Sequence, residues 1–196
     1  MTTTEEAVCN IIHTGLSRLV KETDAMWPGT DRQLPERNLS LYVAHELLGR
    51  GYTVMAEWPL NKNEHIDLVA YDPEARVLVL LESKRAWNRA LELGWLRNDI
   101  ERLERAASSL DAWTLGASEQ WQQIEPQTVI GVVLVGSIDG RALDPERYRR
   151  GKIGDVIRDL IDKVGPFARI SHRDRENPYV LHYAAWRISQ DARVMA

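Results

Sequence analysis

The fold of this chain is decided by residues 66–84, which read IDLVAYDPEARVLVLLESK. Two apolar runs flank the segment 72–75, Asp-Pro-Glu-Ala, whose Asp and Pro favour a tight reversal of the chain. A four-residue loop over residues 73–76 would pair the two runs as an antiparallel hairpin, and Asp67 would then lie opposite Glu82. Each run is therefore interrupted by a carboxylate at the same distance from the turn.

The facing carboxylates predict a cation between them. Opposite side chains in a hairpin lie roughly 4.5–5.5 Å apart at Cβ, and like charges there destabilise the sheet. Both strands are apolar on both faces, which is typical of buried central strands, and a buried carboxylate is costly unless it is paired or bound to a metal. Lys84 shares a face with Glu82, but one lysine cannot neutralise two acids. A divalent ion would complete the charge balance, and oxygen ligands favour Mg²⁺ or Mn²⁺.

Asp67, followed after fourteen residues by Glu82-Ser83-Lys84, resembles the Asp…(Asp/Glu)-x-Lys signature of the PD-(D/E)xK, or restriction-endonuclease-like, nuclease superfamily. Ile66 stands where the signature has its Pro. The resemblance implies a core made of a helix, three antiparallel strands with the acids on the second and third, a second helix and a fourth strand.

Periodicity along the chain predicts elements in that order. The expected helices span residues 4–23, 35–49, 87–113 and 153–164, and the expected strands span residues 52–58, the two arms of the hairpin, 128–135 and 179–188. We therefore predict an α/β fold in a single domain, residues 1–196. Its restriction-endonuclease-like core covers residues 35–136, with an added N-terminal helical extension at 1–34 and a C-terminal helix and strand at 137–196.

The resemblance also implies roles for the residues of the signature. Asp67 and Glu82 would hold the metal, and the carbonyl of Ser83 would add a backbone ligand. Lys84 would orient the attacking water and stabilise negative charge. The bound metal would activate the water for hydrolysis of a phosphodiester.

A glutamate on the first core helix often joins the site in these nucleases, and the helix offers Glu36 and Glu46. Glu46 lies roughly 15 Å farther along the helix, away from the end expected to approach Asp67. We therefore favour Glu36, which would also suit the first turn of a helix as a plain capping charge. We interpret Glu46 as a partner of Arg50, one turn later.

Composition bounds the remaining expectations. The chain of 196 residues is 44% hydrophobic and 28% charged, as in ordinary globular domains, and its single cysteine, Cys9, excludes an internal disulfide or a cysteine-based zinc site. No apolar run approaches the ~20 residues of a membrane helix, and residues 1–6 do not resemble a signal peptide. We expect a cytoplasmic protein without a membrane partner. We expect His65, one residue out of phase with Asp67, to point to the other face, into solvent or a loop. Asp99, on the helix after Lys84, is expected to be an exposed polar residue, with a supporting contact to the site residues as the alternative.

The leading hypothesis is a magnesium-dependent nuclease, a DNA endonuclease by resemblance. The net charge of −4 requires a local basic patch for DNA binding, and we assign it to Arg149, Arg150 and Lys152, with Arg85 beside the site. A third hypothesis is an unrelated α/β protein whose acidic hairpin binds a structural ion. The main alternative is a catalytically silent module of the same fold that binds nucleic acid or a partner protein in a defence or repair complex. A homodimer or a protein partner is compatible with either hypothesis.

Overall fold

Ten helices and strands make up the described part of the chain. The computed structural model describes residues 2–26, 36–86, 89–108, 126–137, 152–171 and 180–189. In chain order the elements are α1 (Thr4–Met26), α2 (Glu36–Leu48), β1 (Thr53–Pro59), β2 (His65–Asp72), β3 (Val77–Ala86), α3 (Arg89–Ser108), β4 (Thr128–Ser137), α4 (Lys152–Val164), β5 (Ala168–Ser171) and β6 (Val180–Arg187). The expected elements are all present, with ends shifted by at most three residues. The expected end of the third helix, near residue 113, lies outside the described residues.

One mixed sheet carries the fold, with strand order β1-β2-β3-β4-β6-β5. Neighbouring strands are antiparallel except for β3 and β4, which run parallel and are joined through α3. The order from α2 to β4 is therefore a helix, three antiparallel strands, a helix and a fourth strand, as predicted. Edge strand β5 was not predicted, because its four residues are too few to show a period of two.

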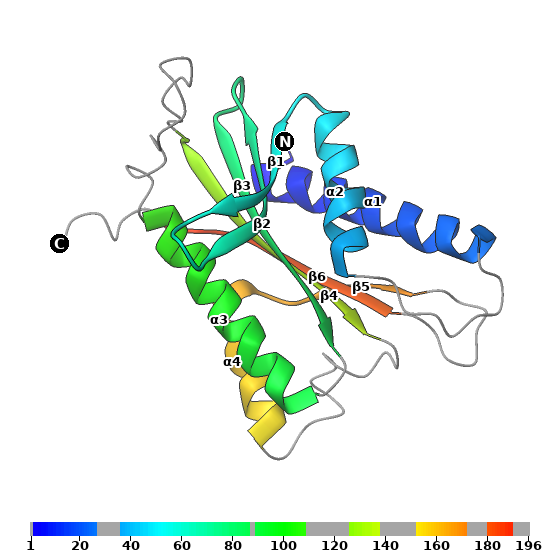
Figure 1. The fold of residues 1–196 in the computed structure, drawn as a ribbon, viewed down its shortest axis with the longest axis vertical. Coiled ribbons are helices and arrows are strands. Elements are labelled where there is room, and N and C mark those ends of the chain that lie inside the picture. Colours follow the sequence, from blue (N-terminus) through cyan, green and yellow to red (C-terminus); the bar gives the residue numbers. More distant parts are fainter. Residues whose placement is uncertain are drawn as a thin grey trace.

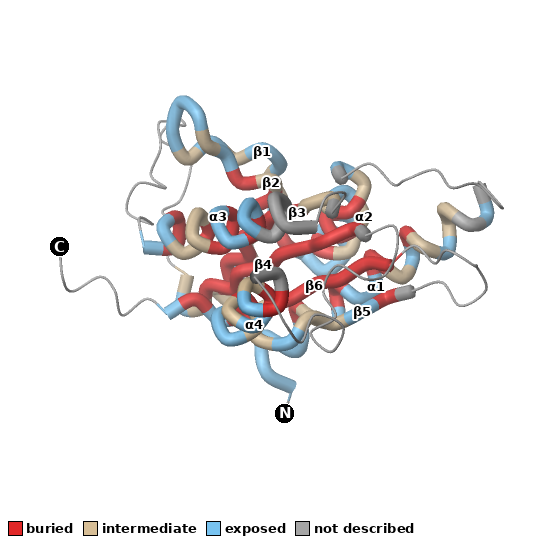
Figure 2. Tube along the Cα trace, turned by 90° about the horizontal axis from the view of Figure 1, so that it is seen from below, coloured by how far each residue is buried: buried red, intermediate tan, exposed pale blue. Residues whose placement is uncertain are grey.

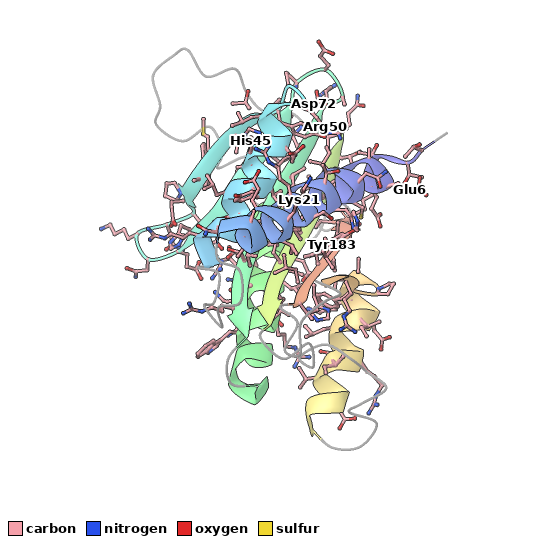
Figure 3. All side chains as sticks on the ribbon, turned by 90° about the vertical axis from the view of Figure 1, so that its right-hand side faces the viewer. Glu6, Lys21, His45, Arg50, Asp72 and Tyr183 are labelled. Carbon is pink, nitrogen blue, oxygen red and sulfur yellow. The ribbon has the colours of Figure 1, made fainter. Side chains whose placement is uncertain are left out.

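The sheet lies between two layers of helices (Figure 1). Helices α1 and α2 cover one face, and α3 and α4 cover the other, so that each face has its own apolar core. Figure 2 shows the buried strands between the more exposed outer sides of the helices. Figure 3 shows α1 beside α2 with Tyr183 of β6 beneath α1, where the Tyr183 hydroxyl lies 3.3 Å from His13 Nδ1.

The β2–β3 hairpin has the predicted register. Its pairs run from Asp72 opposite Val77 to Leu68 opposite Leu81, across a loop of four residues. Asp72 Oδ1 shapes the turn by accepting hydrogen bonds from the backbone N–H groups of Glu74 and Ala75, at 2.9 and 3.0 Å. Asp72 therefore acts as the turn residue that the sequence indicated.

The β1–β2 hairpin changes faces near Glu57 and Asp67, which lie opposite each other between two regular pairs. Leu68 belongs to the core beneath α1 and α2, whereas Ile66 and its neighbour Trp58 pack on the α3 side. Residues two apart in a regular strand share a face, so the strands turn over between these positions. Glu57 has a left-handed backbone, with φ of 53°, at this point.

The far end of the β1–β2 hairpin reaches α3. Arg105 of α3 has its Nη2 atom 3.3 Å from Oε1 of Glu64, in the loop between β1 and β2. Asn61 fixes that loop, because its Oδ1 accepts hydrogen bonds from the N–H groups of Asn63 and Glu64 at 2.9 and 3.0 Å. The bend at Glu57 thus brings the hairpin over the helix that follows β3.

Among the described residues, no helix is both long enough and apolar enough to cross a membrane.

The contact between α1 and α2 depends on Gly15. A Cβ at Gly15 would lie 2.9 Å from the Tyr42 carbonyl oxygen of α2, closer than real Cβ atoms approach backbone. We expect Gly15→Ala to lower the free energy of unfolding by about 1–3 kcal/mol, because the two helices must separate. Gly94→Ala in α3 is the control: a Cβ there meets nothing within 4 Å, and alanine should stabilise the helix by about 0.5–1 kcal/mol. Urea unfolding checks both values, and equal effects at the two positions would contradict the close contact.

Candidate functional site

Asp67 is fixed by the strand beside it. Its Oδ2 atom accepts hydrogen bonds from the backbone N–H and the hydroxyl of Ser83, both at 2.8 Å. These bonds come just beyond the last backbone pair of the hairpin, Leu68 with Leu81, where β2 and β3 begin to separate. Asp67 therefore has one oxygen held by β3, while its Oδ1 faces the β1 side, 4.0 Å from His65 Nε2.

Glu82 is buried and paired with an arginine. Its side chain is only 1% exposed, and its Oε1 accepts a hydrogen bond from Arg102 Nε at 3.0 Å. Arg102 Nη2 lies 2.7 Å from Oε2, although Oε2 lacks hydrogen-bond alignment with any partner. The sequence predicted a lysine and a metal ion as the partners of Glu82, whereas in the structure Arg102 of α3 supplies the opposing charge.

Lys84 and Asp99 extend this pair into a row of alternating charges. Lys84 Nζ lies 3.3 Å from Asp99 Oδ2, and Asp99 Oδ1 accepts a hydrogen bond from Arg102 Nη2 at 2.8 Å. Lys84, Asp99, Arg102 and Glu82 thus join β3 to α3; we call these four residues the charged row. Lys84 remains 27% exposed at its open end, whereas Asp99 and Glu82 are buried. Lys84 and Glu82 lie on the same side of β3, as expected from their spacing.

Burial shifts the titration of the acids in the charged row. Burial raises the pKa of Glu82 from its usual 4.5 to about 8; the hydrogen bond from Arg102 opposes this rise, and the negative charge of Asp67 adds to it. Burial likewise raises the pKa of Asp99, against the opposing effects of Lys84 and Arg102. The site therefore holds a carboxyl group that can carry a proton near neutral pH.

A second group of polar side chains lies on the other side of Asp67. His65 Nε2 is 2.9 Å from Glu57 Oε2 and 4.0 Å from Asp67 Oδ1, and one ligand atom from each residue lies within 4.8 Å of the others. The expectation that His65 faces away from the site is wrong. His65 and Asp67 are two residues apart in β2, and such residues project to the same side of a strand.

The first-helix candidates differ in what the structure describes. Glu36 is the first residue of α2, but its side chain lies outside the described residues. Its helix covers the sheet face opposite α3. Glu46 has its Oε1 3.7 Å from Nη1 of Arg18 in α1, so its described partner is Arg18 rather than the expected Arg50.

Most of the expected DNA-binding patch lies outside the described residues. This applies to Arg149, to Arg150 and to the side chain of Lys152, whose backbone begins α4. Arg85 is half-buried in β3, one residue after Lys84. The patch therefore stays a prediction.

The donors suit a hard cation in chemistry but only in part in arrangement. Asp67 and Glu82 offer carboxylate oxygens, and Asp67 Oδ1 lies away from the hydrogen bonds to Ser83. Both oxygens of Glu82, however, lie beside the guanidinium of Arg102. An ion can bind Glu82 only if Arg102 shares or releases that carboxylate.

Sequence reasoning missed Arg102 and Glu57 and misjudged Asp99 and His65. A helical projection would have found Asp99, since it falls three residues after Leu96, in the buried stripe of α3. Arg102 lies three residues farther on, within reach of the same side chains. Glu57 could not be found, because its place opposite Asp67 depends on the pairing of β1 with β2.

No protein-family model matches this chain. No curated protein and no solved structure matches it significantly either.

The raised pKa of Glu82 predicts a pH-dependent stability. Between pH ~4.5 and ~8 the folded protein keeps a proton on Glu82 that the unfolded chain has released, so rising pH favours unfolding in this window. The contribution of Glu82 should reach at most about 1.4 kcal/mol per pH unit. Glu82→Gln removes the ionisable group, so the free energy of unfolding of this variant should fall less steeply with pH. Urea unfolding across this pH range measures the difference.

Glu101→Gln is the matched control, because it removes an exposed carboxylate from α3 outside the charged row. It should keep the pH dependence of the wild type. Parallel curves for the wild type and Glu82→Gln would show that Glu82 is ionised throughout the window.

Proposed function

We propose that this protein is a divalent-metal-dependent nuclease that hydrolyses phosphodiester bonds, acting as a DNA endonuclease with Mg²⁺ or Mn²⁺. One observation carries the proposal: the ionisable residues of the sequence signature gather where β2 and β3 separate. Asp67 accepts two hydrogen bonds from Ser83, the residue that follows Glu82, and Lys84 lies on the same side of β3 as Glu82. Chance matches to a short signature give no reason for such a gathering.

The arrangement of elements supports the same proposal. The acids lie on the second and third strands of an antiparallel trio, and a helix then leads to a strand parallel to the third. This is the arrangement that the resemblance to restriction-endonuclease-like nucleases implied. The α/β fold and the mixed sheet are observed, and membership of that superfamily belongs to the proposal.

Each residue of the site has a definite part in the proposed reaction. Asp67 and Glu82 would hold the ion, with the Ser83 carbonyl as a third ligand, while the N–H and hydroxyl of Ser83 keep Asp67 in place. A bound divalent ion would lower the pKa of a water ligand and offset charge at the phosphate. Lys84, partly exposed and steadied by Asp99, can donate a hydrogen bond to that water or to a phosphate oxygen.

Arg102 favours the second candidate function, a catalytically silent module that binds nucleic acid or a protein partner. Its guanidinium already opposes the charge of Glu82, and Asp99 already opposes that of Lys84, so the charges of the row balance without an ion. Against this candidate, Lys84 stays partly exposed at the open end of the row. Cleavage assays separate the two candidates.

We expect the purified protein to nick plasmid DNA or to cut single-stranded DNA with Mg²⁺ or Mn²⁺, and not with a chelator. Glu82→Gln and Lys84→Ala should each reduce the cleavage rate by on the order of 100-fold or more, since each removes a charge at the reacting phosphate. Glutamine keeps the size of Glu82 and can still accept a hydrogen bond from Arg102. Folding of each variant is checked by circular dichroism.

Glu101→Gln should cut DNA as fast as the wild type, because Glu101 lies outside the charged row. Undiminished cleavage by Glu82→Gln and Lys84→Ala would refute the assignment of the site. DNA binding by the wild type without cleavage under any metal condition would establish the silent module instead.

We expect the basic segment at residues 149–152, at the start of α4, to bind the phosphate backbone of DNA. Arg149, Arg150 and Lys152 lie just ahead of or at the start of that helix, where backbone N–H groups and positive charge both favour phosphate. Changing all three to Glu should weaken binding to every DNA sequence alike and flatten the dependence of affinity on salt. Titration of labelled DNA at several salt concentrations measures both, and an unchanged salt slope would remove this segment from the binding surface.

A further inference from the structure

Three side chains from two strands converge beside the proposed nuclease site. Glu57 of β1 and His65 and Asp67 of β2 each bring one ligand atom within 4.8 Å of the other two. The closest approach is 2.9 Å, from His65 Nε2 to Glu57 Oε2. All three side chains keep some exposure, at 54%, 52% and 19%, so an ion can reach them from solvent.

The position of the three residues follows from the bend of the hairpin. Glu57 and Asp67 lie opposite each other, where the strands turn over between the two cores. A left-handed backbone at a residue other than glycine costs on the order of 1 kcal/mol and is concentrated at functional sites. Glu57 has this backbone, and its carboxylate meets the imidazole of His65 there.

Asp67 is already oriented for a ligand on this side. Its Oδ2 is held by two hydrogen bonds from Ser83, and Oδ1 is the atom that faces His65. Partners of this kind fix a metal-binding carboxylate before the ion arrives, and their loss commonly reduces metal affinity by 10–100-fold. The described contacts thus give Asp67 one structural oxygen and one ligand oxygen.

The donor set distinguishes this group from the proposed magnesium ligands. Mg²⁺ prefers oxygen atoms and keeps much of its water, whereas an imidazole nitrogen favours first-row transition ions such as Zn²⁺. Two carboxylates and one imidazole leave room for water, as at three-ligand zinc sites. The site therefore suits Zn²⁺ or Co²⁺.

We propose that Glu57, His65 and Asp67 form a binding site for a divalent transition-metal ion. This ion would lie at a different position from an ion held by Asp67 and Glu82, although Asp67 is a ligand at both positions. Glu57 Oε2, His65 Nε2 and Asp67 Oδ1 are the ligand atoms. The site involves neither Glu82 nor Arg102, so its occupancy does not require the charged row to open. It also does not require the protein to be a nuclease.

The test measures metal binding to the full chain after a chelator has removed any bound metal. Calorimetry measures the affinity for Zn²⁺, and the visible absorption spectrum reports the binding of Co²⁺. The wild type should bind one ion at this site and keep it in a large excess of Mg²⁺. His65→Ala should weaken that binding by about 100-fold or more, since a direct ligand matters at least as much as its supporting partners. Glu57→Gln should weaken it in the same direction.

Two controls locate the ion. His45→Gln changes an exposed histidine on α2, on the other face of the sheet, and should leave Zn²⁺ affinity unchanged (Figure 3). Glu82→Gln should change it far less than His65→Ala does, because Glu82 is not a ligand of this ion. Equal affinity in the wild type and His65→Ala would overturn the proposal. Loss of binding in Glu82→Gln equal to that in His65→Ala would assign the ion to the Asp67–Glu82 pair instead.

This measurement is independent of cleavage. A protein that binds Zn²⁺ through His65 but cuts no DNA would support the transition-metal site and refute the nuclease. A protein that cuts DNA with Mg²⁺ and binds Zn²⁺ equally well without His65 would do the reverse.

Discussion

The arrangement of this site depends on the burial of Glu82 in the central strand β3 and on the arginine that opposes its charge. β3 is apolar on both faces and pairs with β2 and β4, so a carboxylate within it has little access to water. Arg102 is the partner that α3 offers, and the contact ties that helix to the sheet. Removing one member of such a pair typically costs about 3–5 kcal/mol, because the other is left buried without compensation. On the same side of α3, Asp99 contacts both Arg102 and Lys84.

Much of the fold could be predicted from local patterns. The turn at residues 72–75 fixed the hairpin register, because Asp72 caps the turn through its own carboxylate. Amphipathic periods gave the helices within a few residues. Strand β5 could not be predicted, because four residues are too few to show the alternation of a strand. The bend at Glu57 could not be predicted either, because it lies where the β1–β2 hairpin changes from packing on one core to packing on the other.

The candidate site was predictable only along β2 and β3. Asp67, Glu82 and Lys84 are set by strand alternation and by the turn, which are local properties. Arg102 lies on α3, eighteen residues after Lys84 in the sequence. The pairing of Arg102 with Glu82 depends on the angle at which α3 crosses the sheet. From the sequence, a metal was inferred on the premise that Lys84 is the single cation near the two acids. The structure weakens that step, and the convergence of the signature residues now carries the nuclease proposal.

The charges of the two neighbouring groups still leave a negative excess. With every acid ionised and His65 neutral, Glu57, Asp67, Glu82 and Asp99 oppose only Lys84 and Arg102 among these contacting residues. A proton on Glu82 lowers this excess by one charge. The negative charges of Asp67 and Asp99 contribute, after burial, to the raised pKa of Glu82. A divalent cation at either proposed position would cancel two charges and so favour the ionised form of Glu82. Proton and metal therefore compete for the same negative charge, and metal binding at Asp67 should release protons near neutral pH even where the ion does not touch Glu82.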